Sequence, residues 1–198
     1  REYAASFALF RQLFAFGGWV TVSAILSPIF IYLDRFLIGS LLTISAVAYY
    51  TAPYEIVTRL LIIPTSIASV LFPSFSSLAS SGVRDKLNVT VMRSTKYLIT
   101  AMVPPTIVLL LFAEDILRIW LGNDFAREST GVLRVLSLAI LLNGIGYIPF
   151  VLIQGVGRPD VLAKYYLIEL PLYVGVAFLL ISKLGIDGAA LASVLRMI

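Results

Sequence analysis

Five long apolar segments, which we interpret as membrane-spanning α-helices, constrain the fold more than any other feature of the sequence. A spanning helix needs roughly 20 mostly apolar residues, whereas the strands of a membrane barrel alternate over about ten. The segments cover Leu13–Leu42, Ser45–Leu78, Tyr97–Phe112, Val132–Ile153 and Tyr165–Ile181, and a sixth begins near Gly188. The sequence therefore predicts an all-α integral membrane protein, a polytopic helix bundle with five full transmembrane helices and a truncated sixth.

The composition excludes several functional classes. Apolar residues make up 60% of the chain and charged residues 13%, against about 45–50% and about 25% in soluble domains. The sequence has no Cys and no His, which excludes disulfides, thiolate chemistry and imidazole chemistry. The basic residues are scattered, so nucleic acid is not an expected partner. We predict no catalytic residues, no metal site and no cofactor, and thus no enzyme.

The loop charges predict an orientation in the membrane. Basic residues concentrate in cytoplasmic loops. One side of the predicted bundle collects Arg1, Arg11, Arg84, Lys86, Arg93, Lys96, Arg158 and Lys164. On the other side Arg118, Arg127 and Lys183 are diluted by five acidic residues. We therefore expect the Ser80–Lys96 and Gly157–Lys164 loops to be cytoplasmic and the Glu114–Glu128 loop to lie outside.

Both ends of the sequence indicate a fragment. The chain starts at Arg1 without a Met and stops at Ile198 inside an apolar run. The first helix enters from the predicted cytoplasmic side, so we expect an even number of spans to precede it.

Four charged residues fall inside the predicted spans: Asp34, Arg35, Glu55 and Arg59. With the first outer turn near Thr43, Arg35 and Glu55 lie at depths that differ by about one helical turn. We expect these two side chains to meet across the hairpin. Glu55 and Arg59 also share one helix face. Asp34 is the least easily paired of the four, and this makes it the best candidate for ion coupling.

Two interpretations of these charges remain open. Charge inside a bilayer is costly, and such residues usually face a cavity or a partner. The cluster is neutral, so it could serve only to fix helix packing. Alternatively, it lines a water-filled pathway for an anionic substrate or a coupling ion, with Tyr50 and Tyr54 extending the polar face outward.

Several motifs together resemble one known family. They are FGGWVTVS at Phe16–Ser23, YLDRFLIG at Tyr32–Gly39, AVAYYTAPYEIVTRL at Ala46–Leu60, IPTSIASVLFPSFS at Ile63–Ser76 and IPFVLIQGVGRPDVLAK within Val132–Lys164. These segments resemble the C-terminal half of bacterial polysaccharide-repeat (O-antigen) flippases of the Wzx type. That family belongs to the superfamily that includes multidrug and toxic-compound exporters.

The resemblance implies a function. Residues 1–198 would form the C-terminal six-helix half of a protein with twelve to fourteen helices. Such a protein moves an undecaprenyl-diphosphate-linked oligosaccharide across the inner (plasma) membrane by alternating access, commonly with proton or sodium coupling. By motif position, the resemblance implies that Asp34, Arg35, Glu55 and Arg59 are the candidate cavity residues of this half.

Other functions remain as alternatives. A drug or cation exporter of the same superfamily would favour a more acidic cavity. A membrane-embedded polysaccharide polymerase or ligase would carry catalytic polar residues on a large outer loop, which the 113–131 segment does not show. A non-transporting scaffold is a third class.

Overall fold

The computed structural model describes residues 4–81 and 84–197, and every regular element in these ranges is a helix. The elements are α1 (Ala4–Leu41), α2 (Ile44–Thr58), the 3₁₀ turn η1 (Arg59–Leu61), α3 (Ile62–Ser80), α4 (Arg84–Leu111), α5 (Ala113–Leu121), α6 (Asn123–Gly155) and α7 (Pro159–Met197). Five segments are long and apolar enough to span a membrane. The all-α, multi-pass prediction is confirmed.

The second predicted span consists of two helices joined by a short break. α2 and α3 follow one another through η1 at Arg59–Leu61 and together form one candidate span, Ile44–Ser80. At the start of this span, the Thr43 hydroxyl accepts a hydrogen bond from the Ala46 amide at 3.1 Å and caps α2.

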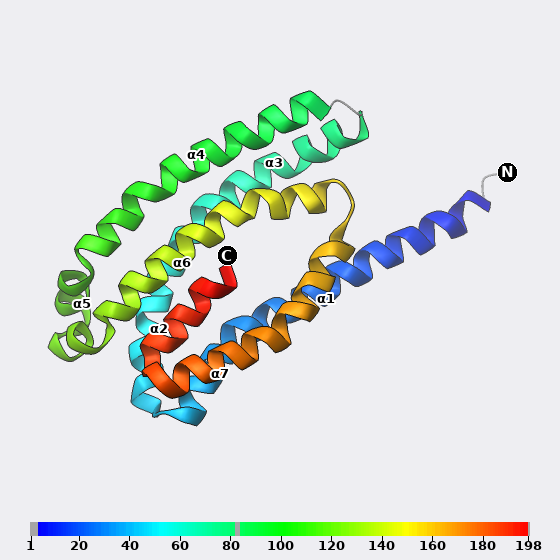
Figure 1. Ribbon diagram of the computed structural model, residues 1–198. Helices are drawn as coiled ribbons and strands as arrows, with labels where there is room; N and C mark the ends of the chain where they lie inside the picture. Colours follow the sequence, from blue (N-terminus) through cyan, green and yellow to red (C-terminus); the bar gives the residue numbers. More distant parts are fainter. Residues whose placement is uncertain (1–3, 82–83, 198) are drawn as a thin grey trace.

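The predicted fifth span and the truncated sixth both lie within α7. Gly185 interrupts the helix with φ 63° and ψ −139°, a conformation open to glycine but not to residues with a side chain. The chain reverses there, as Figure 1 shows for the orange and red segments. A Cβ at Gly188 would overlap the Leu180 carbonyl, so the two legs of α7 approach closely after the turn.

Two predicted loops are helical for most of their length. Within the expected Ser80–Lys96 loop, α4 already begins at Arg84. Within the expected outer loop, α5 occupies Ala113–Leu121, and α6 starts directly after Gly122, where φ is 92°. The α5 sequence is strongly amphipathic and too short to span, and its Ala113 and Leu117 side chains are fully buried. Arg1 and Gly82 lie outside the described residues, as do the side chains of Arg11 and Arg84.

The two connections that were predicted to lie on the same side of the membrane lie at the same end of the bundle. The α3–α4 and α6–α7 connections lie at one end of the bundle, and the Gly185 turn lies at the other with the α1–α2 connection (Figure 1). In the α6–α7 connection, Arg158 Nε donates to Asp160 Oδ1 at 3.0 Å, and this hydrogen bond raises the pKa of the Arg158 guanidinium. Which end faces the cytoplasm stays a prediction.

α6 is the central helix, with contacts to α2, α3, α4, α5 and α7. α3 and α4 pack on one side of it, and α1 packs with α7 on the other. Figure 1 shows these two groups on opposite sides of α6. The bundle therefore has two sides that share α6.

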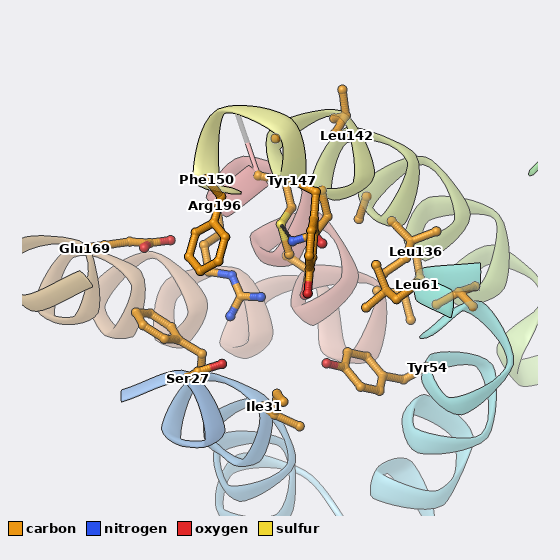
Figure 2. Close-up of a pocket in the computed structure, with 18 of the residues that line it drawn as sticks. Ser27, Ile31, Tyr54, Leu61, Leu136, Leu142, Tyr147, Phe150, Glu169 and Arg196 are labelled. Atoms are coloured by element: carbon orange, nitrogen blue, oxygen red, sulfur yellow. Dashed lines mark hydrogen bonds between the residues drawn. The ribbon is translucent and has the colours of Figure 1, made fainter. Parts of the chain in front are cut away.

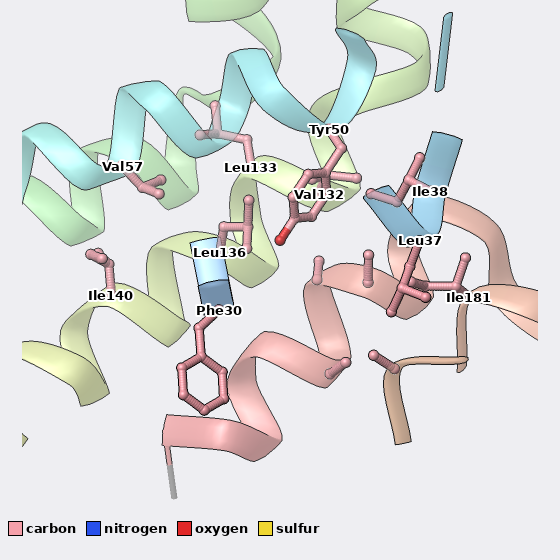
Figure 3. Packing of buried hydrophobic residues seen from close by; sticks show 14 of the residues in the cluster. Phe30, Leu37, Ile38, Tyr50, Val57, Val132, Leu133, Leu136, Ile140 and Ile181 are labelled. Atoms are coloured by element: carbon pink, nitrogen blue, oxygen red, sulfur yellow. The ribbon is translucent and has the colours of Figure 1, made fainter. Parts of the chain in front are cut away.

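Each side has its own core. On the α3–α4 side, Phe75, Leu98, Met102 and Ile148 are fully buried against one another. The larger cluster joins α1, α2, α5, α6 and α7, and Figure 3 shows Tyr50 reaching from α2 toward Val132 and Leu133 on α6. This second core, unlike the first, also contains a carboxylate.

Candidate substrate cavity

Asp34 is buried in the middle of α1 with 2% of its surface exposed, and three hydroxyl groups contact its carboxylate. Tyr50 donates to Oδ2 at 3.0 Å, Tyr173 donates to Oδ1, and Ser193 lies 3.5 Å from Oδ2. Tyr50 and Ser193 also contact each other at 3.1 Å. A buried charge is tolerated only with such partners. Among the described residues Asp34 forms no ion pair, and hydroxyl groups that the sequence analysis did not predict as partners satisfy its carboxylate.

Helical spacing explains how these groups meet. Phe30, Asp34 and Leu37 lie at i, i+4 and i+7 on the buried face of α1. On the second leg of α7, Ala189 and Ala192 are fully buried beside Ser193. Small residues let helices approach closely. They bring the Ser193 hydroxyl within reach of a carboxylate 159 positions earlier in the chain.

The predicted Arg35–Glu55 contact is confirmed. Arg35 Nη2 lies 2.6 Å from Glu55 Oε1 and joins α1 to α2. The Arg35 guanidinium also lies over the rings of Tyr32 and Tyr54, 5.9 Å and 5.5 Å from their centroids. These contacts hold the α1–α2 hairpin together.

Arg59 does not join this pair. It lies in η1 and is exposed, and within the described part of the chain the ion pair of Glu55 is with Arg35. The expected shared face of Glu55 and Arg59 thus produces no ion pair, because the helix tightens from α2 into η1 at this point.

A cavity of about 340 Å³ lies between α1, α2, α6 and α7 (Figure 2). Its volume is within the range of about 300–1,000 Å³ typical of small-ligand sites. Tyr54 lines it, as does Ser193 of the Asp34 network, whereas Asp34 and Tyr50 lie behind the wall. Arg35, Glu55 and Arg59 are not among the lining residues. Of the six predicted site residues, Tyr54 alone therefore lines this cavity.

Arg196 is the cationic group of the cavity. Its guanidinium carbon lies 5.0 Å from the Phe30 ring centroid and 5.1 Å from the Tyr173 ring centroid. Its Nη1 is buried and has no hydrogen-bond partner among the described residues. A buried donor without a partner is costly, and an anionic ligand would satisfy it.

Sequence reasoning missed Arg196 as a site residue. The available signal was an arginine inside the apolar run of the truncated sixth span. Glu169, which is not among the predicted site residues, also lines the cavity, on the first leg of α7 (Figure 2).

A second, more apolar cavity of about 260 Å³ shares three residues of this wall, Tyr165, Glu169 and Arg196. Its other lining residues are mostly aliphatic, including Ile168, Leu172, Val176 and Leu195. Arg196 therefore stands where a polar, aromatic cavity meets an apolar groove. This arrangement suits an amphipathic anion.

The apolar spans and the polar cavity between them define a multi-pass integral membrane protein. The sequence profile of the family described as "Polysaccharide biosynthesis protein" matches residues 2–130. The chain belongs to this family, and the resemblance to Wzx-type polysaccharide flippases is confirmed.

Named relatives agree with this assignment. The chain is 33% identical over 96% of its length to a "Putative O-antigen transporter" of Shigella flexneri. It is 26% identical over 96% of its length to the "Probable low-salt glycan biosynthesis flippase Agl15" of Haloferax volcanii. It is 30% identical over 94% of its length to an uncharacterized membrane protein of Methanocaldococcus jannaschii.

The chain covers 44%, 40% and 37% of these three relatives, less than half of each. No solved structure matches it significantly.

Proposed function

We propose that this chain is the C-terminal half of a flippase that moves lipid-linked oligosaccharide from the cytoplasmic to the outer leaflet. The observation that carries the proposal is the Arg196 guanidinium, which is half-buried in the wall of a membrane cavity and whose buried Nη1 has no hydrogen-bond partner among the described residues. The diphosphate between lipid and sugar is an anion that such a guanidinium would bind through two parallel hydrogen bonds. The names of the relatives from Shigella flexneri and Haloferax volcanii support this substrate class.

The adjoining apolar groove supports a lipid-linked substrate over a free sugar. A polyprenyl chain needs an apolar surface, and the aliphatic residues of the groove lie directly beside Arg196. A drug cation would be repelled by the same guanidinium. The flippase function is therefore favoured over cation export.

Alternating access is part of the proposal. The cavity lies between α6, the helix that both sides share, and α1, α2 and α7. Rocking of such packed helix groups around a central site is a common way for transporters to change the side that is open.

We assign ion coupling to Asp34. A proton, or a sodium ion held by carboxylate and hydroxyl oxygens, would change the contacts of Asp34 with Tyr50, Tyr173 and Ser193. These contacts link α1 to α2 and to both legs of α7, so a change in the charge of Asp34 would alter how the helices pack. The Arg35–Glu55 pair would serve to keep the α1–α2 hairpin rigid.

The test is export of surface glycan by the full-length protein in a strain that lacks its own flippase. Arg196→Gln should lower export at least tenfold at equal protein level in the membrane. Arg93→Gln, on the exposed surface of α4, is the matched control and should keep export. Full export by Arg196→Gln with loss in Arg59→Gln would move the anion site to η1 and contradict the assignment.

Ion coupling needs a separate experiment. In inverted membrane vesicles, Asp34→Asn should transport lipid-linked oligosaccharide at a rate that no longer responds to an imposed proton or sodium gradient. The asparagine keeps the shape of Asp34 and removes its charge. A normal response by Asp34→Asn would exclude Asp34 as the coupling site.

A further inference from the structure

Aromatic rings form much of the wall of the cavity beside Arg196. Six of them, drawn from α1, α2, α6 and α7, border it: Phe30, Tyr54, Tyr147, Phe150, Tyr165 and Tyr166. A guanidinium that only had to hold a phosphate would not need them. Their presence calls for a ligand with a flat, weakly polar face.

Five of these rings pair with another cavity ring at a tilt, whereas Tyr54 stacks on Tyr50, which is not a lining residue. Tyr147 and Phe150 have centroids 5.9 Å apart and planes at 49°, and Phe30 and Tyr166 have centroids 5.8 Å apart and planes at 58°. Tilted pairs satisfy the edge of one ring and leave faces available to a third partner. Figure 2 shows Tyr147 and Tyr54 reaching into the cavity from α6 and from α2.

Polar groups are placed among these rings. Glu169 lines the cavity as an acceptor, and Arg196 lines it as a donor. Asn143 also lines it, with its amide nitrogen 2.9 Å from the Met197 sulfur, and its side-chain oxygen has no hydrogen bond among the described residues. Few, spaced polar groups in an aromatic wall fix the orientation of a ligand that has hydroxyl groups around its edge.

A sugar ring has the matching chemistry. The C–H groups on the face of a pyranose carry partial positive charge and are attracted to the negative face of an aromatic ring. Its hydroxyl groups lie at the edge, where they can bond carboxylate, amide and guanidinium. An organic cation would also seek ring faces, but Arg196 already covers those of Phe30 and Tyr173 and would repel it.

We propose that this aromatic cavity binds a pyranose ring of the substrate, next to the phosphate held by Arg196. The inference rests on the proposed function and deepens it, because the cavity would then bind the sugar of the substrate as well as its phosphate. Tyr147 is the most useful residue to change. It is half-buried, it lines the cavity, and its ring pairs with Phe150.

The experiment measures binding of two lipids to the full-length protein in lipid nanodiscs. One is polyprenyl diphosphate, and the other is polyprenyl diphosphate that carries one N-acetylhexosamine. Tyr147→Leu should weaken binding of the glycosylated lipid about tenfold, as expected for loss of one ring contact, and should change binding of the bare diphosphate less than twofold. Tyr147→Phe keeps the ring and should bind both lipids like the wild type.

Tyr97→Leu is the matched control, since Tyr97 is 67% exposed on α4 and is absent from the cavity wall. Should Tyr147→Leu prove unstable, Phe150→Leu replaces it with the same expected result, because Phe150 lines the aromatic cavity and does not line the apolar groove. Equal loss for both lipids, or no loss for either, would overturn the sugar site and leave the flippase function intact. Failure of the wild type to bind either lipid would overturn both.

Discussion

The two sides of the bundle bury different chemistry around the same central helix. On the α3–α4 side the core is apolar, and the buried Thr106 hydroxyl donates to the Met102 carbonyl of its own helix at 2.8 Å. On the α1–α2–α7 side the Asp34 carboxylate is bonded by hydroxyl groups from other segments, and a cavity opens beside it. The first side has the features of a scaffold. The second has the features of a site, because its polar contacts cross between helices that could move.

The largest expected effect on stability comes from truncating a core side chain on the α3–α4 side. Phe75 on α3 is fully buried, so Phe75→Ala leaves a cavity among Leu98, Met102 and Ile148. We expect the free energy of unfolding to fall by about 3 kcal/mol, which is at the low end for such truncations. The value is low because the Phe75 ring is transferred to lipid and not to water when the protein unfolds. Denaturation in mixed micelles measures it.

The control for Phe75→Ala is Phe72→Ala on the same helix, where the side chain is 41% exposed. Phe72→Ala should lower the free energy of unfolding much less than Phe75→Ala. If the two substitutions cost the same, the α3–α4 side is not a tightly packed scaffold.

A smaller loss is expected from removing one hydroxyl on the polar side. Tyr173→Phe deletes the donor to Asp34 Oδ1 and keeps the ring beside Arg196. Because one carboxylate oxygen of Asp34 then loses its hydrogen bond, we expect the free energy of unfolding to fall by about 1–2 kcal/mol. The same denaturation assay measures it, with Tyr97→Phe on the exposed surface of α4 as control. Stability unchanged from the wild type would mean that the Asp34 network does not hold the helices together.

The smallest effect is expected from the matching deletion on the apolar side. Thr106→Val removes a hydroxyl that bonds only within α4, and the Met102 carbonyl can keep its ordinary helix bond. We expect a change within about 0.5 kcal/mol. A loss as large as that of Tyr173→Phe would remove the distinction between the two sides.

The sequence predicted the parts of this account that depend on local pattern. Hydropathy alone predicted which segments span the membrane. The rise per residue of a helix predicted that Arg35 and Glu55 lie at similar depths on either side of the α1–α2 connection and can form an ion pair. The sequence could not predict the partners of Asp34, because Tyr173 and Ser193 lie 139 and 159 positions away in the chain. α5 was missed because its nine residues are too short for a span and carry an ordinary mixture of charges.

Arg196 illustrates the same limit. Its place beside Phe30 depends on the reversal at Gly185, which returns the second leg of α7 between α1 and α6 (Figure 1). The spacing of the fifth and sixth predicted spans indicated a turn between them, but it did not predict which residue the turn brings to the cavity. The charged residues of the first two spans therefore predicted the buried Asp34 and the Arg35–Glu55 pair. The cation that lines the cavity, Arg196, comes instead from the last helix.

The most direct test of the central claim is transfer of a diphosphate-linked oligosaccharide between the leaflets of proteoliposomes that contain the full-length protein. Arg196→Gln and the control Arg93→Gln are compared with the wild type at equal protein content. We predict that the wild type and Arg93→Gln transfer the lipid at the same initial rate and that Arg196→Gln is at least tenfold slower. Transfer by Arg196→Gln at the wild-type rate would contradict the claim that this cavity carries the substrate.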